Sequence, residues 1–371
     1  MAEHTGTHVT TYYVHGENGD DDANDGTSLL APWNTIQKAF DELAAGNIVD
    51  GDEVRILKTS DDATHYGISA KLTITWSGRE VLITGANSSG VVDGTVVTIN
   101  GDGLDGSTPM MEISVAVADN VIFANLKFDA DDTAQHCVEA TSANSHNLYW
   151  ANCQFTQATS HGVYTNNLAM YWQFVNCRFD NNGGDGANHS SSNYGVYYKC
   201  LFDNNAGNGG RIGAAAKVVE CVFFNNGNEG MYISNNGATV FNCVFDNNAS
   251  DGVYVSGGNQ SMFVDCLFTN NTAYGIVVGS GAENRHFNSA FYNNGTDSFY
   301  ESGTKHLTMH NYLDDVTTTY DDASNFDFTH NSGSSVVGAG MPTHYKWFGS
   351  TASDIGLGKF RAEGGESISI F

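Results

Sequence analysis

The chain has 371 residues, and its 15 lysines and arginines against 42 aspartates and glutamates give a formal net charge of −27. This charge excludes nucleic-acid binding, because contacts with phosphates need a cationic face. Hydrophobic residues make up 40% of the chain, yet no run of 18 apolar residues occurs, so we expect a folded protein without membrane insertion.

The N-terminal residues MAEHTGTHVTTYYV have neither the basic nor the apolar region of a signal peptide, which predicts no Sec export. The segment DDDANDG over 20–26 follows, and it concentrates the oxygen ligands that Ca²⁺ prefers. Its spacing is not that of an EF-hand. Two interpretations stay open, a solvated acidic turn or a structural calcium site whose ligands are Asp20, Asp22, Asn24 and Asp25. No cofactor is required by the sequence.

Residues 32–43 predict a helix, because Pro32 stands at the start and Ile36, Ala39, Phe40 and Leu43 recur at helical spacing. Short strands are predicted after it at Glu53 to Leu57, Leu72 to Trp76, Val81 to Thr84, Val96 to Ile99 and Val121 to Phe128.

An internal repeat dominates the middle of the chain. Six cysteines recur at intervals of 24, 23, 21, 22 and 23 residues, and each is followed two residues later by a phenylalanine and then, in five cases, by an Asn-Asn pair. The cysteines are Cys153, Cys177, Cys200, Cys221, Cys243 and Cys266. Residues two apart on a strand share a face, so cysteine and phenylalanine are predicted to point inward together. Asparagine tolerates the positive φ that a corner needs.

Each repeat therefore reads as a strand, an asparagine corner, a second strand and a variable loop, which fits one coil of a parallel β-helix. The fold class is all-β, a single-stranded right-handed parallel β-helix (solenoid) with an N-terminal capping helix. An N-terminal strand, acidic loop and capping helix are predicted over 1–50, coils over 51–300 and an irregular C-terminal cap over 301–371. The seventh thiol, Cys137, lies outside the ladder, and all seven are predicted to be reduced.

The opening YYVHGENGDDDANDGTSLLAPWNTIQKAFDEL, the following DGDEVRIL and the ladder resemble right-handed parallel β-helix proteins of the pectate-lyase-like superfamily, including the phage tailspike type. The resemblance implies the fold and, for the tailspike type, a homotrimer. It leaves function open, because this fold hosts lyases, hydrolases, epimerases, adhesins and tailspikes. Family catalytic motifs are not matched, since only Ser160-His161-Gly162 and Arg211-Ile212-Gly213 approach them.

Four catalytic candidates precede the glycine of the second strand in the repeats: His161, Asp185, Glu229 and Asp251. If the coils stack, His161 and Asp185 would lie about 5 Å apart, and so would Glu229 and Asp251. Paired carboxylates about 5–10 Å apart are what a glycosidase requires. The alternative is that polar residues at the start of a strand simply face water.

Tyr164, Tyr232 and Tyr254 follow two residues after that glycine, and alternation with apolar neighbours predicts that they face outward. They could contact a glycan or a partner subunit, or be ordinary half-buried wall residues.

Two functions of different class follow. The first is a bacteriophage virion surface protein (capsid decoration or a fibre- or tailspike-like component), assembled in the host cytoplasm, bound to other virion or capsid proteins and in contact with a cell-surface glycan. The alternative is an extracellular polysaccharide lyase or glycoside hydrolase. Missing catalytic motifs and scarce basic residues favour the first, and predict no lyase or hydrolase turnover.

Overall fold

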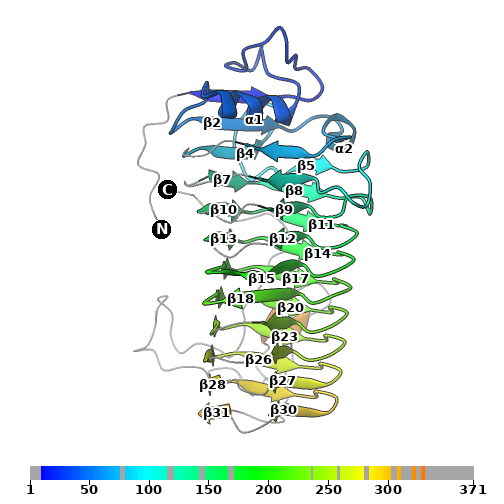
Figure 1. Ribbon diagram of the computed structural model, residues 1–371, viewed down its shortest axis with the longest axis vertical. Coiled ribbons are helices and arrows are strands. Elements are labelled where there is room, and N and C mark those ends of the chain that lie inside the picture. Colours follow the sequence, from blue (N-terminus) through cyan, green and yellow to red (C-terminus); the bar gives the residue numbers. More distant parts are fainter. Residues whose placement is uncertain are drawn as a thin grey trace. The chain divides into compact units, whose positions relative to one another are not determined.

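The computed structural model describes residues 10–330 except 76–79, 115–120, 142–146, 166–170, 235–236, 257–259, 280–283, 302–306, 311–319 and 323–326. The chain forms two compact units, one up to Arg178 and one from Phe179 onward, called unit 1 and unit 2 below. In each unit the chain winds repeatedly through three parallel sheets, A, B and C (Figure 1). This is the predicted parallel β-helix.

In unit 1, sheet A contains β1 (Thr11–Val14), β2 (Glu53–Leu57), β4 (Leu82–Ala86), β7 (Val121–Ala124), β10 (Leu148–Ala151) and β13 (Trp172–Val175). Sheet B contains β5 (Val97–Asn100), β8 (Leu126–Asp129) and β11 (Gln154–Thr156), and sheet C contains β3 (Leu72–Ile74), β6 (Met111–Ile113), β9 (Val138–Ala140) and β12 (Val163–Thr165). Strand β14 (Arg178–Asp180) spans the boundary between the units.

In unit 2, sheet A contains β16 (Val196–Tyr198), β19 (Lys217–Val219), β22 (Thr239–Phe241), β25 (Ser261–Val264), β28 (Asn284–Phe287) and β31 (Leu307–His310). Sheet B contains β17 (Leu201–Asp203), β20 (Val222–Phe224), β23 (Val244–Asp246), β26 (Leu267–Thr269) and β29 (Ala290–Tyr292). Sheet C contains β15 (Ala187–Asn193), β18 (Gly210–Ala214), β21 (Met231–Ile233), β24 (Val253–Val255), β27 (Tyr274–Val278) and β30 (Asp297–Glu301). A separate antiparallel pair is formed by β32 (Tyr320–Asp322) and β33 (Asp327–His330).

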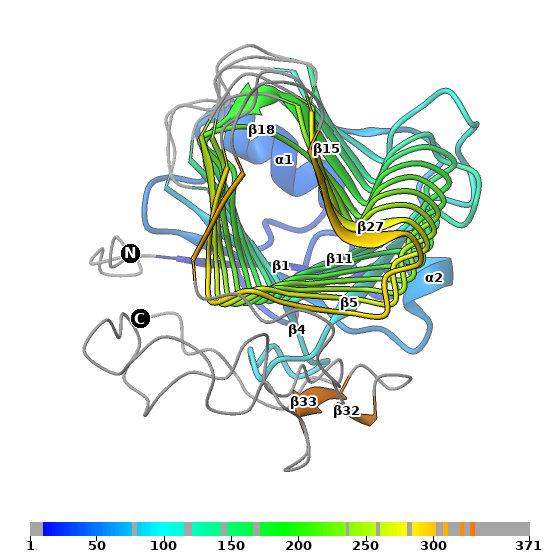
Figure 2. The ribbon, with the colours of Figure 1, turned by 90° about the horizontal axis from the view of Figure 1, so that it is seen from below.

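The core of unit 2 is a set of identical side chains stacked from coil to coil, enclosed by the three sheets (Figure 2). Phe223 stacks on Phe245 with ring centroids 4.9 Å apart, and Phe245 on Phe268 at 5.0 Å. All seven cysteines are buried and none forms a disulfide. The inward ladder of cysteine and phenylalanine is therefore confirmed.

The asparagine pairs form two parallel ladders at the corner after sheet B. The first asparagine of each pair has a positive φ, 55° at both Asn225 and Asn247. The second is buried and bonds along the stack, with Asn226 Nδ2 donating to Asn248 Oδ1 at 3.0 Å and Asn248 Nδ2 to Asn271 Oδ1 at 2.9 Å. This confirms the predicted corner and its side-chain hydrogen bonds.

The structure corrects the number of strands in each coil from two to three. A second corner lies before each cysteine of the repeat, where residues such as Asn152, Lys199 and Glu220 adopt φ of 53°, 54° and 52°. The strand before that corner belongs to sheet A. For the same reason the single strand predicted over Val121 to Phe128 was wrong, because Asn125, at φ 55°, divides it into β7 and β8.

The predicted helix forms the N-terminal cap as α1 (Ile36–Ala45), with Thr35 as N-cap and Gly46, at φ 82°, as C-cap. Its buried face is Ile36, Ala39, Phe40 and Leu43, as the spacing predicts. A second helix, α2 (Asp62–His65), has Asp61 as N-cap.

At the other end, pairing of β27 with β30 and of β28 with β31 extends the coils beyond residue 300, the predicted limit, to His310. Most of the predicted C-terminal cap, including all of 331–371, lies outside the described residues.

Candidate functional site

The outer face of sheet C presents a line of side chains, one from each coil, because alternation turns every second residue of a strand outward. We call this line of residues the outer column. Strand register gives its members as Thr73, Glu112, Glu139 and Tyr164 in unit 1, and as Asn188, Arg211, Tyr232, Tyr254, Val277 and Tyr300 in unit 2. The three predicted tyrosines are half-buried between buried neighbours, so the prediction that they face outward is confirmed.

In unit 2 three successive members of the outer column stack on one another. The guanidinium carbon of Arg211 lies 4.7 Å from the ring centroid of Tyr232, and that ring lies 5.4 Å from Tyr254 with an angle of 11° between the planes. Both faces of Tyr232 are therefore covered. The stack offers phenol hydroxyls, ring edges and guanidinium N–H groups to a ligand.

A second line of residues, the turn column, lies two residues before the sheet C strands β6, β9, β12, β15, β18, β21 and β24. Its members are Pro109, His136 and His161 in unit 1, and Asp185, Asn208, Glu229 and Asp251 in unit 2. Strand register places Tyr274, the first residue of β27, at the next position. The turn column contains all four catalytic candidates. His161 belongs to unit 1 and Asp185 to unit 2.

Side chains of the turn column accept the backbone N–H of the next coil. Asp185 Oδ1 accepts from Asn208 N at 2.8 Å, Asp251 Oδ1 from Tyr274 N at 3.0 Å, and His136 Nδ1 from His161 N at 3.2 Å. Asp185 and Asp251 are only 4% and 7% exposed. These carboxylates do not simply face water, because they hold one coil to the next.

Asp185 has further partners. Its Oδ1 also accepts from Asn208 Nδ2 at 2.8 Å, and its Oδ2 accepts from Asn188 Nδ2 at 3.0 Å. Arg211 Nε lies 3.3 Å from Oδ2, close enough for an ion pair although the geometry is not that of a hydrogen bond. The arrangement fixes Arg211 over Tyr232.

Glu229 and Asp251 occupy successive positions of the turn column. Burial, and next the charge of Glu229, raise the pKa of Asp251 to about 6, against the opposing hydrogen bond from Tyr274. Glu229 Oε1 accepts from Ser250 Oγ at 3.3 Å. A carboxyl of raised pKa beside a second carboxyl is a feature of acid-base sites, so a catalytic role for this pair stays a prediction.

In unit 1 the two columns meet at an aromatic cluster. The ring of His136 lies 5.4 Å from that of His161 and 4.8 Å from that of Tyr164. Burial, and then the neighbouring His161, lower the pKa of His136 to about 4, so this imidazole is neutral at pH 7. Sequence reasoning missed His136, as well as Glu112 and Glu139, because they lie before the regular cysteine repeats.

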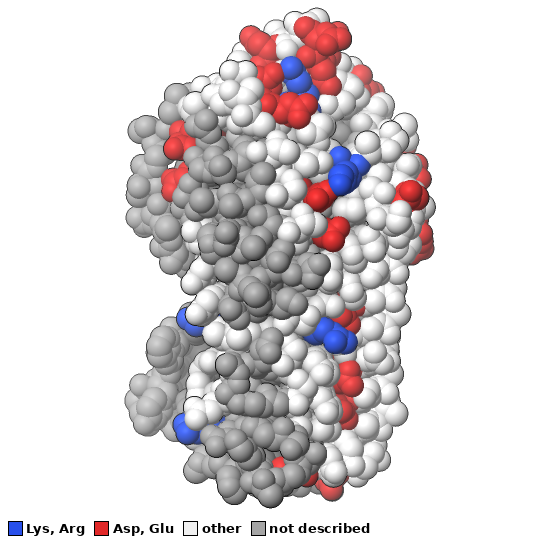
Figure 3. Space-filling model, in the orientation of Figure 1, with Lys and Arg blue, Asp and Glu red and all other residues white. Residues whose placement is uncertain are grey.

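The acidic N-terminal loop binds its own backbone. Asp20 Oδ1 accepts from the N–H groups of Asp22 and Ala23, both at 2.9 Å, and Asp25 Oδ1 accepts from Thr27 N at 2.9 Å. These bonds lower the pKa of Asp20 and Asp25, and Asn24 Nδ2 donates to Pro32 O at 2.7 Å. Figure 3 shows acidic atoms gathered at the top of the view, where Figure 1 places this loop. Among the described residues no three His, Cys, Asp or Glu side chains form a group that could hold a metal ion, and calcium here stays a prediction.

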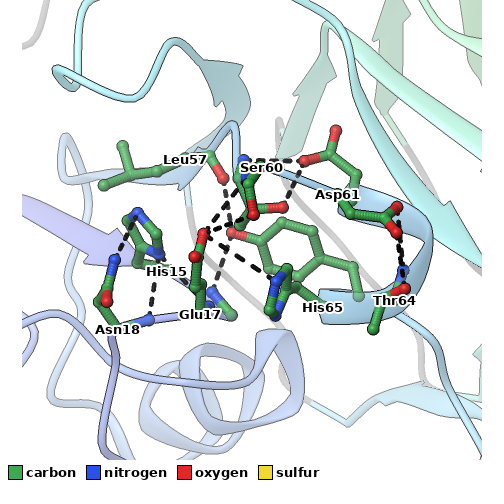
Figure 4. Close-up of polar contacts among 12 residues, drawn as sticks. His15, Glu17, Asn18, Leu57, Ser60, Asp61, Thr64 and His65 are labelled. Carbon is green, nitrogen blue, oxygen red and sulfur yellow. Dashed lines mark hydrogen bonds and ion pairs between the residues drawn. The ribbon is translucent and has the colours of Figure 1, made fainter.

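Another polar cluster joins this loop to α2 (Figure 4). Glu17 Oε2 accepts from Ser60 N at 3.3 Å and Ser60 Oγ at 3.1 Å, and lies 3.9 Å from His65 Nε2. His15 Nδ1 accepts from the N–H groups of Glu17 and Asn18. The bonds run between loops of the cap, which indicates that they fasten it.

A family model described as the right handed beta helix region matches residues 111–263 and 212–341. The chain belongs to this β-helix family. No curated protein matches the chain in sequence. Within the described residues no helix is long and apolar enough to span a membrane.

Solved structures show the same fold. Pectate lyase Pel9A is similar with a TM-score of 0.55 and 15% identity, over 95% of this chain and 97% of that one. ORF18 of Geobacillus virus E2 is similar with a TM-score of 0.58 and 16% identity, over 83% of this chain and 62% of the viral chain. At these identities the likeness establishes the β-helix architecture, with one neighbour from a phage and one a polysaccharide lyase.

Proposed function

We propose that this β-helix protein is a bacteriophage virion surface component, a capsid decoration or fibre-like protein, that contacts a cell-surface glycan. The observation that carries the proposal is the outer column of unit 2, where Arg211, Tyr232 and Tyr254 form a continuous outward stack. The carboxylates of Asp185 and Glu229 lie beside it in the turn column.

This surface has the chemistry for a polyhydroxylated ligand. Phenol hydroxyls donate and accept hydrogen bonds, a guanidinium only donates, and carboxylates only accept. Arg211 is held in place by Asp185 and Tyr232, so little side-chain entropy is lost when a ligand binds. A row of such groups, repeated at the spacing of the coils, matches an extended glycan better than a compact ligand.

Two observations support a virion location. A phage protein shares the fold, and seven buried cysteines outside any disulfide suit a protein assembled in the reducing cytoplasm of a host. Unit 1 also exposes apolar side chains on adjoining loops, with Leu30 97%, Val91 54% and Leu29 44% exposed. We propose that they contact other virion proteins or further copies of this chain in a homotrimer.

Glycan binding is tested with wild type and the Tyr232→Ala/Tyr254→Ala double variant on a glycan array and on host cells. We expect binding by the wild type and at least a tenfold loss in the variant. Tyr198→Ala is the matched control, because Tyr198 is a half-buried outward tyrosine on sheet A of the same unit. Equal binding by all three proteins would reject the outer column as the contact surface.

The virion location is tested on purified phage particles. Antibody labelling in electron micrographs should place the chain on the outer surface, and light scattering of the isolated protein should give the mass of a trimer. A chain that is absent from purified particles, or present only in the culture medium, would favour the extracellular enzyme.

A polysaccharide lyase or glycoside hydrolase is the second candidate, and the raised pKa of Asp251 beside Glu229 favours it. Asp251 is 7% exposed and already accepts from Tyr274 N, which limits its access to a substrate. Turnover of any polysaccharide that disappears in Asp251→Asn would establish this pair as catalytic.

A further inference from the structure

Unit 1 carries a second pair of neighbouring carboxylates, Glu112 and Glu139, on the outer column. They stand on β6 and β9 in direct register, each as the half-buried outward residue between two buried ones. Adjacent strands lie about 4.8 Å apart. This spacing places the two carboxyl groups near the separation of about 5–5.5 Å at which retaining glycosidases hold their acid and nucleophile.

The two carboxyls have different surroundings. Glu112 forms an ion pair with Lys71 and accepts from Thr141 Oγ1 at 3.1 Å. Glu139 has no hydrogen-bond partner for its carboxyl among the described residues. Burial, and then the charge of Glu112, raise the pKa of Glu139, while Lys71 acts weakly in the opposite direction. One carboxyl is thus held in place by a cation, and the other is biased toward its protonated form.

The pair lies between two features that could hold a sugar. Lys71 also lines a hollow of about 480 Å³, together with Ser69, Asp105 and Ser107. In the other direction along the outer column, Glu139 is followed by Tyr164, which stacks on His136 and His161. A saccharide crossing the pair would meet hydroxyl and carboxylate groups on one side and a phenol with two imidazoles on the other.

We propose that Glu139 and Glu112 are the acid and the nucleophile of a retaining glycosidase site for a neutral glycan. Glu139 donates its proton to the glycosidic oxygen, the bond from C1 to that oxygen breaks with its electron pair on the leaving oxygen, and Glu112 bonds to C1. Water then gives a proton to Glu139 and attacks C1, which releases Glu112 as the carboxylate. This goes beyond glycan contact and does not depend on unit 2.

The charge of the site selects the substrate class. Among the described residues, three carboxylates, Glu112, Glu139 and Asp105, lie near Lys71, and Glu112 already binds that cation. A uronate would meet this negative field. A neutral hexose or N-acetylhexosamine polymer has no such penalty.

The test uses the full chain with a panel of neutral polysaccharides and of 2,4-dinitrophenyl glycosides of the common neutral hexoses. We expect Glu139→Gln to lower polysaccharide turnover about 100- to 10,000-fold, and to leave cleavage of a dinitrophenyl glycoside far less affected, because that leaving group needs no proton. Glu112→Ala should lose both activities, and azide should restore the second with a product of inverted configuration.

Labelling provides a readout that needs no variant, because a 2-deoxy-2-fluoro dinitrophenyl glycoside should leave a sugar on Glu112 that mass spectrometry locates. Glu220→Gln is the matched control, since burial also raises the pKa of that carboxyl, which lies in unit 2. The control should keep full activity. No turnover on the whole panel, or turnover that survives both Glu112→Ala and Glu139→Gln, would overturn the proposal.

Discussion

Asn248 bonds with the coils on both sides of it. Its Oδ1 accepts from Asn226 N and Nδ2, at 3.2 and 3.0 Å, while its Nδ2 donates to Phe223 O at 3.1 Å and to Asn271 Oδ1 at 2.9 Å. A buried amide with this many partners explains why asparagine, with both a donor and an acceptor, fills the position in every coil of unit 2.

Replacing this side chain should therefore be costly. Asn248→Ala leaves several buried polar groups without partners, and each costs about 1–3 kcal/mol, so we expect the free energy of unfolding to fall by about 3–5 kcal/mol in urea melts. Asn247→Ala is the control, because Asn247 is exposed and the change mainly adds the penalty of about 1–2 kcal/mol for a positive φ. Equal losses in both variants would contradict the role of the buried ladder.

Asp251 makes the stability of unit 2 depend on pH. Its pKa is about 6 in the folded chain against 3.8 for an unperturbed aspartate. The folded state holds this proton more tightly, so the stabilisation is fully present below pH 3.8 and is lost as the pH rises through 6.

Asp251→Asn should remove this dependence and keep the hydrogen bond from Tyr274 N. We expect the variant to unfold with a free energy about 1–3 kcal/mol higher than wild type at pH 7, and similar to it at pH 4. Asp185→Asn should instead destabilise the fold at pH 7, because Arg211 loses its ion-pair partner. A constant difference between Asp251→Asn and wild type across this pH range would show that Asp251 does not titrate as inferred.

At the scale of an element, the cysteine ladder joins the backbone N–H group of one cysteine to the sulfur atom of the cysteine in the next coil. Cys200 N donates to Cys221 Sγ, and Cys221 N donates to Cys243 Sγ, both at 3.4 Å. Burial raises the pKa of Cys221 and Cys243 well above the ordinary thiol value. Both effects keep the thiolate, the reactive form, out of the native state.

A thiol titration measures this directly. At pH 8 the native protein should show no rapidly reacting thiol, and after unfolding in guanidinium it should show all seven. One or more fast native thiols would mean that the stack opens at that coil.

The sequence predicts the elements to the extent that their residues repeat. Cysteine, phenylalanine and the asparagine pair recur at fixed spacing, so the coil, the corner after sheet B and the inward face were predictable. The sheet A strands WQFV, KVV and TVF share no such pattern, and the positive φ of Lys199 and Glu220 contradicts the usual preference of these residues. The third strand of each coil, in sheet A, could therefore not be predicted from the sequence.

The candidate sites, like the strands, were predictable only where their residues lie in regular repeats. Tyr232 and Tyr254 lie in regular coils, and alternation alone placed them outward. Glu112 and Glu139 become neighbours only through the pairing of β6 with β9, across a segment without the cysteine repeat. Hydrogen bonds such as that from Tyr274 N to Asp251 are likewise long-range contacts, which no local pattern predicts.

Across the whole molecule, buried histidines lower the free energy of unfolding as the pH falls. Burial lowers the pKa of His189 and His286 to about 3, and burial with His161 lowers that of His136 to about 4. Because each folded pKa is below the unperturbed 6.5, the stabilisation is present above pH 6.5 and is lost as the pH falls toward 3–4. At pH 5 each histidine reduces the free energy of unfolding by about 2 kcal/mol.

His286 gives the sharpest test of this acid response. Its ring is fully buried, stacks on Phe263 at 4.6 Å, and has no hydrogen-bond partner for either nitrogen within the described residues. His286→Phe continues the aromatic column and removes two buried polar atoms, so it should raise the free energy of unfolding at pH 7 by about 1–3 kcal/mol. The gain should grow by about 2 kcal/mol between pH 6.5 and pH 5. Urea melts at pH 7, 6 and 5 measure both effects. A gain that stays constant with pH would mean that His286 does not resist protonation, and the acid sensitivity of the fold would then have to come from other groups.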